Sequence, residues 1–96
     1  MTRYFVYWKS VNSRIPEDRD AKIKQSIGFL QIIKEALKSG PIKEFGVRPD
    51  DVEGYAIFEG SEIDMARMAT MFVPNFEYEV YPILSADEMM EVLKSA

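Results

Sequence analysis

The chain contains no histidine and no cysteine in its 96 residues. It therefore lacks the commonest proton shuttle at neutral pH, the thiolate nucleophile and the softer metal ligands. It also has no phosphate-binding glycine loop, no nucleophile elbow and no metal-ligand spacing. We expect neither a metal nor a cofactor, so any chemistry would rest on carboxylates, tyrosines, lysines, hydroxyls or amides.

Positive charge is also scarce, because 12 Lys and Arg stand against 16 Asp and Glu and give a net charge of -4. An acidic surface repels phosphate backbones, so we expect no nucleic-acid partner. No apolar run approaches the roughly 20 residues that cross a bilayer, and the first residues do not resemble a signal peptide. We therefore expect a cytoplasmic protein with no membrane partner.

The length predicts a single domain over residues 1–96, since domains cluster near roughly 100–150 residues. Hydrophobic residues make up 47% of the sequence, which indicates a folded chain. A chain of this size buries only about 60–65% of its unfolded surface, so its own core is modest. Association with a second copy is a common way to bury more apolar area.

Residue types and spacing predict four strands and three helices. Phe76–Ile83 shows the clearest alternation of apolar and polar side chains. Helices are expected to begin at Pro16 and at the serine capping boxes of residues 61–64 and 85–88. The predicted order is strand 3–9, helix 16–38, strands 42–47 and 54–59, helix 61–73, strand 76–83 and a short helix from 85. In the first helix, three- and four-residue spacing predicts a buried stripe of Ile23, Ile27, Leu30, Ile33 and Leu37.

This order predicts a ferredoxin-like α+β fold, in which two crossover units form a four-stranded antiparallel sheet of order 4-1-3-2. Two helices then cover one face of the sheet, and the short C-terminal helix follows. The central strands carry apolar side chains at odd and even positions, so either Phe5 and Tyr7, or Tyr4, Val6 and Trp8, meet the helices. The other set would leave a large apolar patch, so we expect a homodimer through the open sheet face.

Three segments resemble a known family: Arg3-Tyr4-Phe5-Val6-Tyr7-Trp8, Gly54-Tyr55-Ala56-Ile57-Phe58-Glu59 and the strand from Phe76 to Pro82. Their pattern is similar to that of the dimeric α+β barrel superfamily and, within it, to a small family of uncharacterised domains. The resemblance implies a dimeric α/β barrel whose protomers pair through their sheets, with a pocket between sheet and helices. It implies no single activity, because this fold hosts many functions.

Two branches of that superfamily depend on a histidine, either to ligate haem iron or to pair with an aspartate. Neither role transfers to this chain, because it has no histidine. A third branch, of cofactor-free oxygenases that act on polycyclic phenols, uses asparagine, tryptophan and tyrosine. Asn12, Trp8 and Tyr7 supply these residue types, but their spacing gives no match to that branch.

Glu77 and Glu79 are the candidate catalytic residues, because they project from one face of a strand about 7 Å apart. Such a pair can move a proton or hold a hard cation. The commoner explanation is structural, with the two charges lying on an exposed edge strand or forming salt bridges at a dimer rim.

The candidate ligand-binding residues are aromatic or polar. Arg48 could clamp a substrate carboxylate, although a local ion pair with Asp50 or Asp51 is the simpler expectation. Asn12 could orient a ligand or form an Asx turn. Four aromatic residues could line a pocket for a flat ligand, or pack in the core and the dimer interface: Trp8, Tyr7, Tyr55 and Tyr81.

These features predict a small homodimeric domain that binds a small organic molecule or serves as an accessory module. A second hypothesis is a cofactor-independent enzyme, of monooxygenase or isomerase type, acting on a small aromatic substrate. In that case Trp8 and the tyrosines would hold the ring, and Glu77 or Glu79 would move a proton. A third hypothesis is a purely structural interaction domain.

Overall fold

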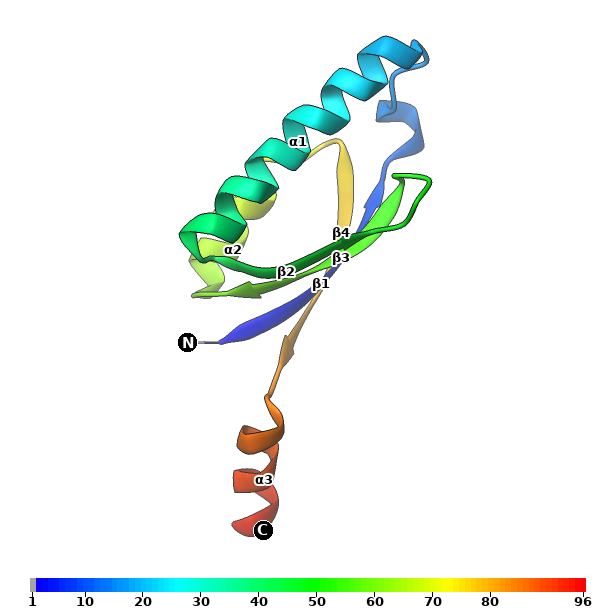
Figure 1. Ribbon diagram of the computed structural model, residues 1–96. Coiled ribbons are helices and arrows are strands. Elements are labelled where there is room, and N and C mark those ends of the chain that lie inside the picture. Colours follow the sequence, from blue (N-terminus) through cyan, green and yellow to red (C-terminus); the bar gives the residue numbers. More distant parts are fainter. Residues whose placement is uncertain (1) are drawn as a thin grey trace.

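The computed structural model describes residues 2–96 and shows an α+β fold built on a four-stranded antiparallel sheet (Figure 1). The sheet order β2-β3-β1-β4 is the predicted order 4-1-3-2 read from the opposite edge, so this prediction is confirmed. The elements in chain order are β1 (Arg3–Ser10), the 3-10 turn η1 (Asn12–Arg14), α1 (Arg19–Ser39), β2 (Ile42–Val47), β3 (Glu53–Glu59), α2 (Glu62–Thr70), β4 (Phe76–Ile83) and α3 (Ala86–Lys94).

The two central strands present different side chains to the two faces of the sheet. Val6 on β1 lies opposite Ala56 on β3 and Val80 on β4, whereas Phe5 lies opposite Ile57 and Tyr81. Residues that face each other across a ladder share one face. The register therefore assigns every strand residue to one side.

The helices cover the side that carries Tyr4, Val6 and Trp8. These three residues are buried, as are Ala56 and Phe58 on β3. Figure 1 shows α1 and α2 on this side of the sheet, while α3 extends away from the sheet beyond the end of β4. Of the two sets of β1 residues that the sequence allowed, Tyr4, Val6 and Trp8 therefore meet the helices. We call the other side of the sheet the open face. It carries four partly exposed residues: Phe5, Tyr7, Tyr55 and Ile57.

The predicted start of α1 was wrong. The helix begins at Arg19 rather than near Pro16, because the Asp18 side chain accepts a hydrogen bond of 2.9 Å from the backbone N–H of Ala21 and caps it. Its end was predicted correctly, with Gly40 in the left-handed conformation at φ 110°.

The predicted buried stripe of α1 was wrong in part. Ile33 is buried, but Ile27 is 51% exposed, and Ile23 and Leu37 are also exposed. The helix is rotated so that Phe29 meets the rings of Phe72 and Phe76, with centroids 5.5 and 5.0 Å apart. Aromatic packing against α2 and β4 therefore selects a stripe adjacent to the predicted one.

Two helices begin with the predicted capping boxes but differ in what they pack against. The hydroxyls of Ser61 and Ser85 each accept a hydrogen bond of 3.1 Å from the backbone N–H three residues later. Met65 of α2 is buried in the core, whereas every residue of α3 is exposed. The stability of α2 is thus coupled to the core, and that of α3 is not.

Ser61→Ala is expected to lower the free energy of unfolding by about 1 kcal/mol, because it removes a cap from a helix that packs on the core. Ser85→Ala removes the same cap from α3 and should leave the unfolding midpoint unchanged. Urea denaturation followed by tryptophan fluorescence compares the two variants. Equal losses would show that α3 packs against folded protein in solution.

Candidate functional site

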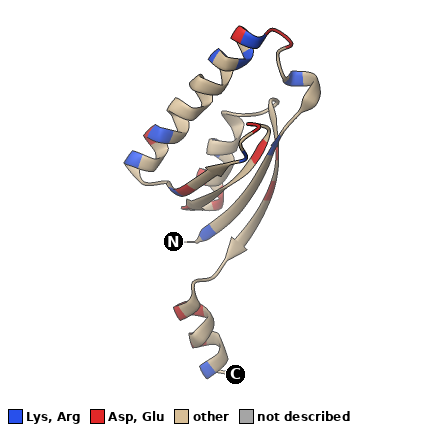
Figure 2. Ribbon diagram, turned by 45° about the vertical axis from the view of Figure 1, so that its right-hand side comes forward, with Lys and Arg blue, Asp and Glu red and all other residues tan. Residues whose placement is uncertain are grey.

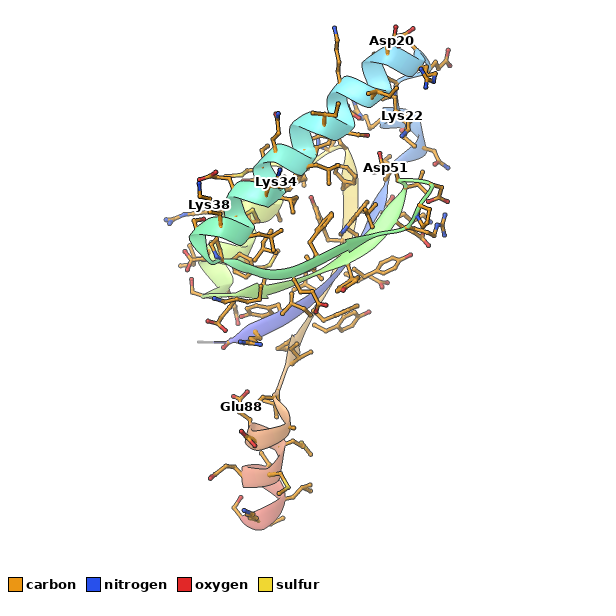
Figure 3. All side chains as sticks on the ribbon, viewed as in Figure 1. Asp20, Lys22, Lys34, Lys38, Asp51 and Glu88 are labelled. Atoms are coloured by element: carbon orange, nitrogen blue, oxygen red, sulfur yellow. The ribbon has the colours of Figure 1, made fainter. Side chains whose placement is uncertain are left out.

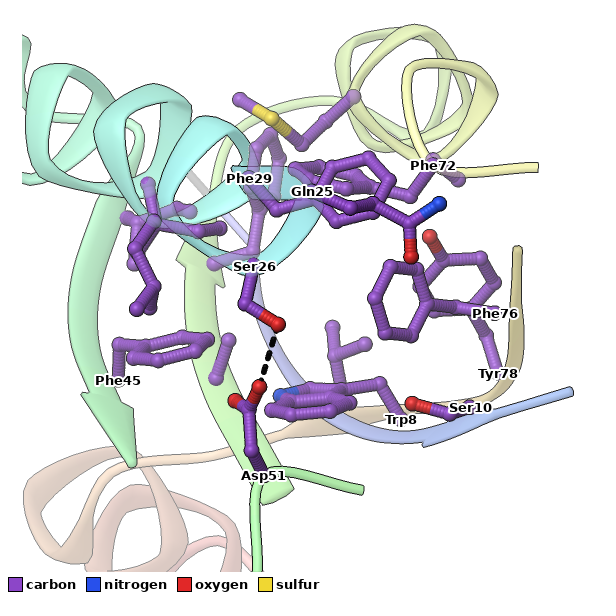
Figure 4. Close-up of a pocket in the computed structure, with 18 of the residues that line it drawn as sticks. Trp8, Ser10, Gln25, Ser26, Phe29, Phe45, Asp51, Phe72, Phe76 and Tyr78 are labelled. Atoms are coloured by element: carbon purple, nitrogen blue, oxygen red, sulfur yellow. Dashed lines mark hydrogen bonds between the residues drawn. The ribbon is translucent and has the colours of Figure 1, made fainter. Parts of the chain in front are cut away.

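A cavity of about 90 Å³ lies between the sheet and the two covering helices. Figure 4 shows its aromatic walls, which include Phe29 of α1, Phe72 after α2 and Phe76 of β4. The charged residues of α1 lie toward its two ends, so residues 25–33 over the cavity carry no charge (Figure 2). The space is therefore apolar over most of its surface.

The indole of Trp8 forms the sheet side of this cavity and is held on three sides. Phe45 stacks on it with ring centroids 5.8 Å apart, and Phe76 meets it edge-on at 5.4 Å. Gly54 lies opposite Trp8 in the ladder, and a Cβ there would come within 2.7 Å of the indole. The absence of a side chain at Gly54 lets the ring lie flat against β3.

Two of the residues that line the cavity each carry a buried polar atom with no partner among the described residues. Trp8 is 8% exposed, and its Nε1 and the hydroxyl of Tyr78 are both buried without a hydrogen bond to any residue from 2 to 96. A buried polar group left unsatisfied costs about 1–3 kcal/mol. Burial raises the pKa of the Tyr78 hydroxyl well above its ordinary value, so this group stays protonated at neutral pH.

A polar cluster joins α1 to the β2–β3 turn beside the indole. The Ser26 hydroxyl donates to Asp51 Oδ2 at 2.5 Å, and Lys22 Nζ lies 3.3 Å from the same oxygen. Asp51 has a left-handed backbone, with φ at 64°, which aspartate tolerates better than most residues. Figure 3 shows Lys22 on α1 above Asp51 in the turn. All three side chains line the cavity.

The predicted local ion pair of Arg48 is confirmed. Its Nε lies 2.8 Å from Asp50 Oδ2, and Nη1 contacts Glu53. The Tyr7 hydroxyl donates to the other Glu53 oxygen at 2.7 Å, and this bond raises the pKa of Tyr7. The bond from Arg48 lowers the pKa of Asp50. Arg48 and Tyr7 therefore meet through Glu53, and neither lines the cavity.

The sheet separates the candidate carboxylates from Trp8. Glu79 lies opposite Tyr7 and Glu77 opposite Lys9, so both project from the open face. Tyr55 and Tyr81 share that face, and Glu44 beside Tyr55 raises the pKa of its hydroxyl. Asn12 is exposed in η1 and does not line the cavity. Of the predicted site residues, the structure places Trp8 alone in the cavity wall.

Sequence reasoning missed the other polar residues of the cavity. The alternation over Phe76–Ile83 predicts that Tyr78 shares a strand face with Phe76 and Val80, and the register confirms this, but the pattern does not mark its hydroxyl as a ligand contact. Ser26 and Lys22 stand four residues apart on α1, and this spacing was the available signal that they share a side.

The chain thus combines an antiparallel α+β fold with a largely apolar cavity, two of whose lining residues carry unpartnered polar atoms. No protein-family model, curated protein or solved structure matches it. Within residues 2–96, no group of three acidic side chains is placed to hold a metal ion. In the part of the chain that the structure describes, no helix is both long and apolar enough to cross a membrane.

Proposed function

We propose that the protein is a homodimeric domain that binds a small organic molecule between its sheet and its helices. The observation that carries this proposal is a pair of buried, unpartnered polar atoms, Trp8 Nε1 and Tyr78 Oη, on two residues that line a largely apolar cavity. Ligand sites in proteins combine such apolar walls with a few convergent polar groups. A bound molecule would offset the cost of leaving these two groups unsatisfied.

The open face supports the dimer. Its centre is apolar, with the rings of Phe5 and Tyr55 stacked 6.0 Å apart beside Ile57. Charged side chains surround this centre, among them Arg3 and Glu59, which pair at 2.8 Å. An apolar centre with a charged rim is the usual anatomy of a protein interface. In this proposal the protomer is ferredoxin-like, and two sheets pack face to face into a dimeric α/β barrel.

The enzyme hypothesis receives less support from the geometry. It requires Glu77 or Glu79 beside the ring held by Trp8, but these carboxylates lie across the sheet from the indole. Asp51 is the carboxylate that lines the cavity, and it already accepts from Ser26 and Lys22. A binding role needs none of these groups to react.

The binding proposal is tested by filling the cavity. Ala69 of α2 lines it, whereas Ala66 of the same helix is exposed. A library of small organic fragments is screened for compounds that raise the melting temperature and change the emission of Trp8, the single tryptophan. We expect Ala69→Leu to abolish both effects, because the larger side chain occupies the ligand space, and Ala66→Leu to retain them. The proposal fails if no fragment has both effects, or if Ala69→Leu still responds.

A further inference from the structure

The chemistry of the two unpartnered groups determines which kind of ligand atom can form a hydrogen bond with them. An indole Nε1–H donates and cannot accept, so its partner must be an acceptor. The Tyr78 hydroxyl keeps its proton and can also donate. Both residues line the cavity, and Trp8 is fixed in place by Phe45 and Phe76. A ligand that satisfies them therefore carries an oxygen or nitrogen with a free lone pair.

The charges around the cavity disfavour an ion. Among the described residues that line it, only Lys22 and Asp51 are charged, and they already form a pair at 3.3 Å. An anion would face the Asp51 carboxylate with no free cation to balance it. A cation would meet the Trp8 N–H, which can only donate a hydrogen bond. Burying an unpaired charge costs far more than burying a neutral acceptor that is hydrogen-bonded.

The volume of the cavity limits the size of the molecule. A cavity of about 150 Å³ lined by apolar side chains takes up benzene, which has six heavy atoms. The space here is about 90 Å³, so it holds roughly four to six heavy atoms unless the wall yields. A single small ring is therefore the largest group that this space encloses.

We infer that the ligand is a compact, uncharged organic molecule with a hydrogen-bond acceptor, such as the carbonyl oxygen of a small ketone. The acceptor is bound by Trp8 Nε1 or by the Tyr78 hydroxyl, and the apolar part contacts the surrounding phenylalanine rings. This inference rests on the proposed binding function and specifies its ligand class.

Four probes of six heavy atoms each separate the effects of a neutral acceptor, an apolar group, an anion and a cation: cyclopentanone, methylenecyclopentane, isobutyrate and cyclopentylammonium. They are titrated into the ¹⁵N-labelled full chain, where the single tryptophan gives one indole N–H resonance. We expect cyclopentanone to bind about tenfold more tightly than methylenecyclopentane and to move the indole proton downfield. The two ions should bind at least tenfold more weakly than the ketone.

Variants identify the donors. The losses of cyclopentanone affinity in Tyr78→Phe and in Trp8→Phe are expected to multiply to about fivefold to tenfold. Neither substitution should change the binding of methylenecyclopentane. Tyr81→Phe on the open face is the matched control and should change neither. Tyr78→Phe keeps the same ring, so it tests the inference even if Trp8→Phe fails to fold.

The possible outcomes distinguish a failure of this inference from a failure of the proposed binding function. If methylenecyclopentane or either ion binds as tightly as the ketone, the cavity takes a ligand but the acceptor requirement is wrong. An indole resonance that stays in place while the ketone binds, together with an unchanged ketone affinity in Tyr78→Phe, has the same meaning, since a buried water would then satisfy the two donors. If no probe and no library fragment binds, the binding function itself fails.

Discussion

Replacing Ile57 with aspartate is expected to dissociate the proposed dimer into monomers. Ile57 lies on a central strand at the middle of the open face, directly opposite Phe5. A carboxylate there would be buried against the partner sheet without a cation, and such a buried, unpaired charge costs several kcal/mol. We expect the dissociation constant of the dimer to rise at least about 100-fold.

Sedimentation equilibrium measures this change across a range of protein concentrations. Ile63→Asp is the control, because Ile63 is 66% exposed on α2, which covers the other side of the sheet. It adds the same charge and should leave the dimer intact. A wild-type chain that sediments as a monomer would contradict the face-to-face dimer, as would an Ile57→Asp chain that remains dimeric.

Gly54→Ala is expected to lower the free energy of unfolding by about 3 kcal/mol, at the upper end of the cost of overpacking. The added Cβ would lie 2.1 Å from the backbone oxygen of Gly46 and 2.9 Å from Val47 Cα on β2. Backbone atoms of a paired strand cannot move aside as a flexible side chain can. The substitution must therefore separate β2 from β3 and displace the Trp8 indole from the cavity wall.

Gly28→Ala provides the matched control for this change. Gly28 lies within α1, and a Cβ there would meet no atom within 4 Å. The same substitution should raise the free energy of unfolding by up to about 1 kcal/mol, since alanine favours a helix. Urea denaturation of both variants tests whether the two changes in the free energy of unfolding have opposite signs. A Gly54→Ala chain as stable as the wild type would show that β2 and β3 do not approach this closely.

The fold could be predicted from the sequence wherever the signal was local. Alternation over Phe76–Ile83 and the two serine capping boxes specified β4 and the starts of α2 and α3 without reference to distant residues. The stripe of α1 could not be predicted in the same way. Apolar residues occupy two adjacent stripes of that helix, and the choice between them depends on the rings of Phe72 and Phe76, more than 40 residues away.

The candidate site was predicted less well, for a related reason. Trp8 was selected as one of four aromatic residues that could line a pocket for a flat ligand, and it does line the cavity. The remaining polar contacts join distant parts of the chain, since Asp51 meets Ser26 and Lys22 only after the β2–β3 turn folds back over α1. The pattern of a single strand carries no information on which side chains such a turn will meet.

Both outer strands of the sheet have features that prevent further strands from joining. The register of β2 with β3 shifts between Ile42 and Glu44, which breaks the regular spacing of its backbone groups. On the other margin, Pro82 interrupts β4, where it lacks an N–H to offer an added strand. Lateral addition of copy after copy, as in a fibril, is therefore blocked at both margins. The apolar surface of this chain can accordingly be covered by a closed pair without leading to an open-ended polymer.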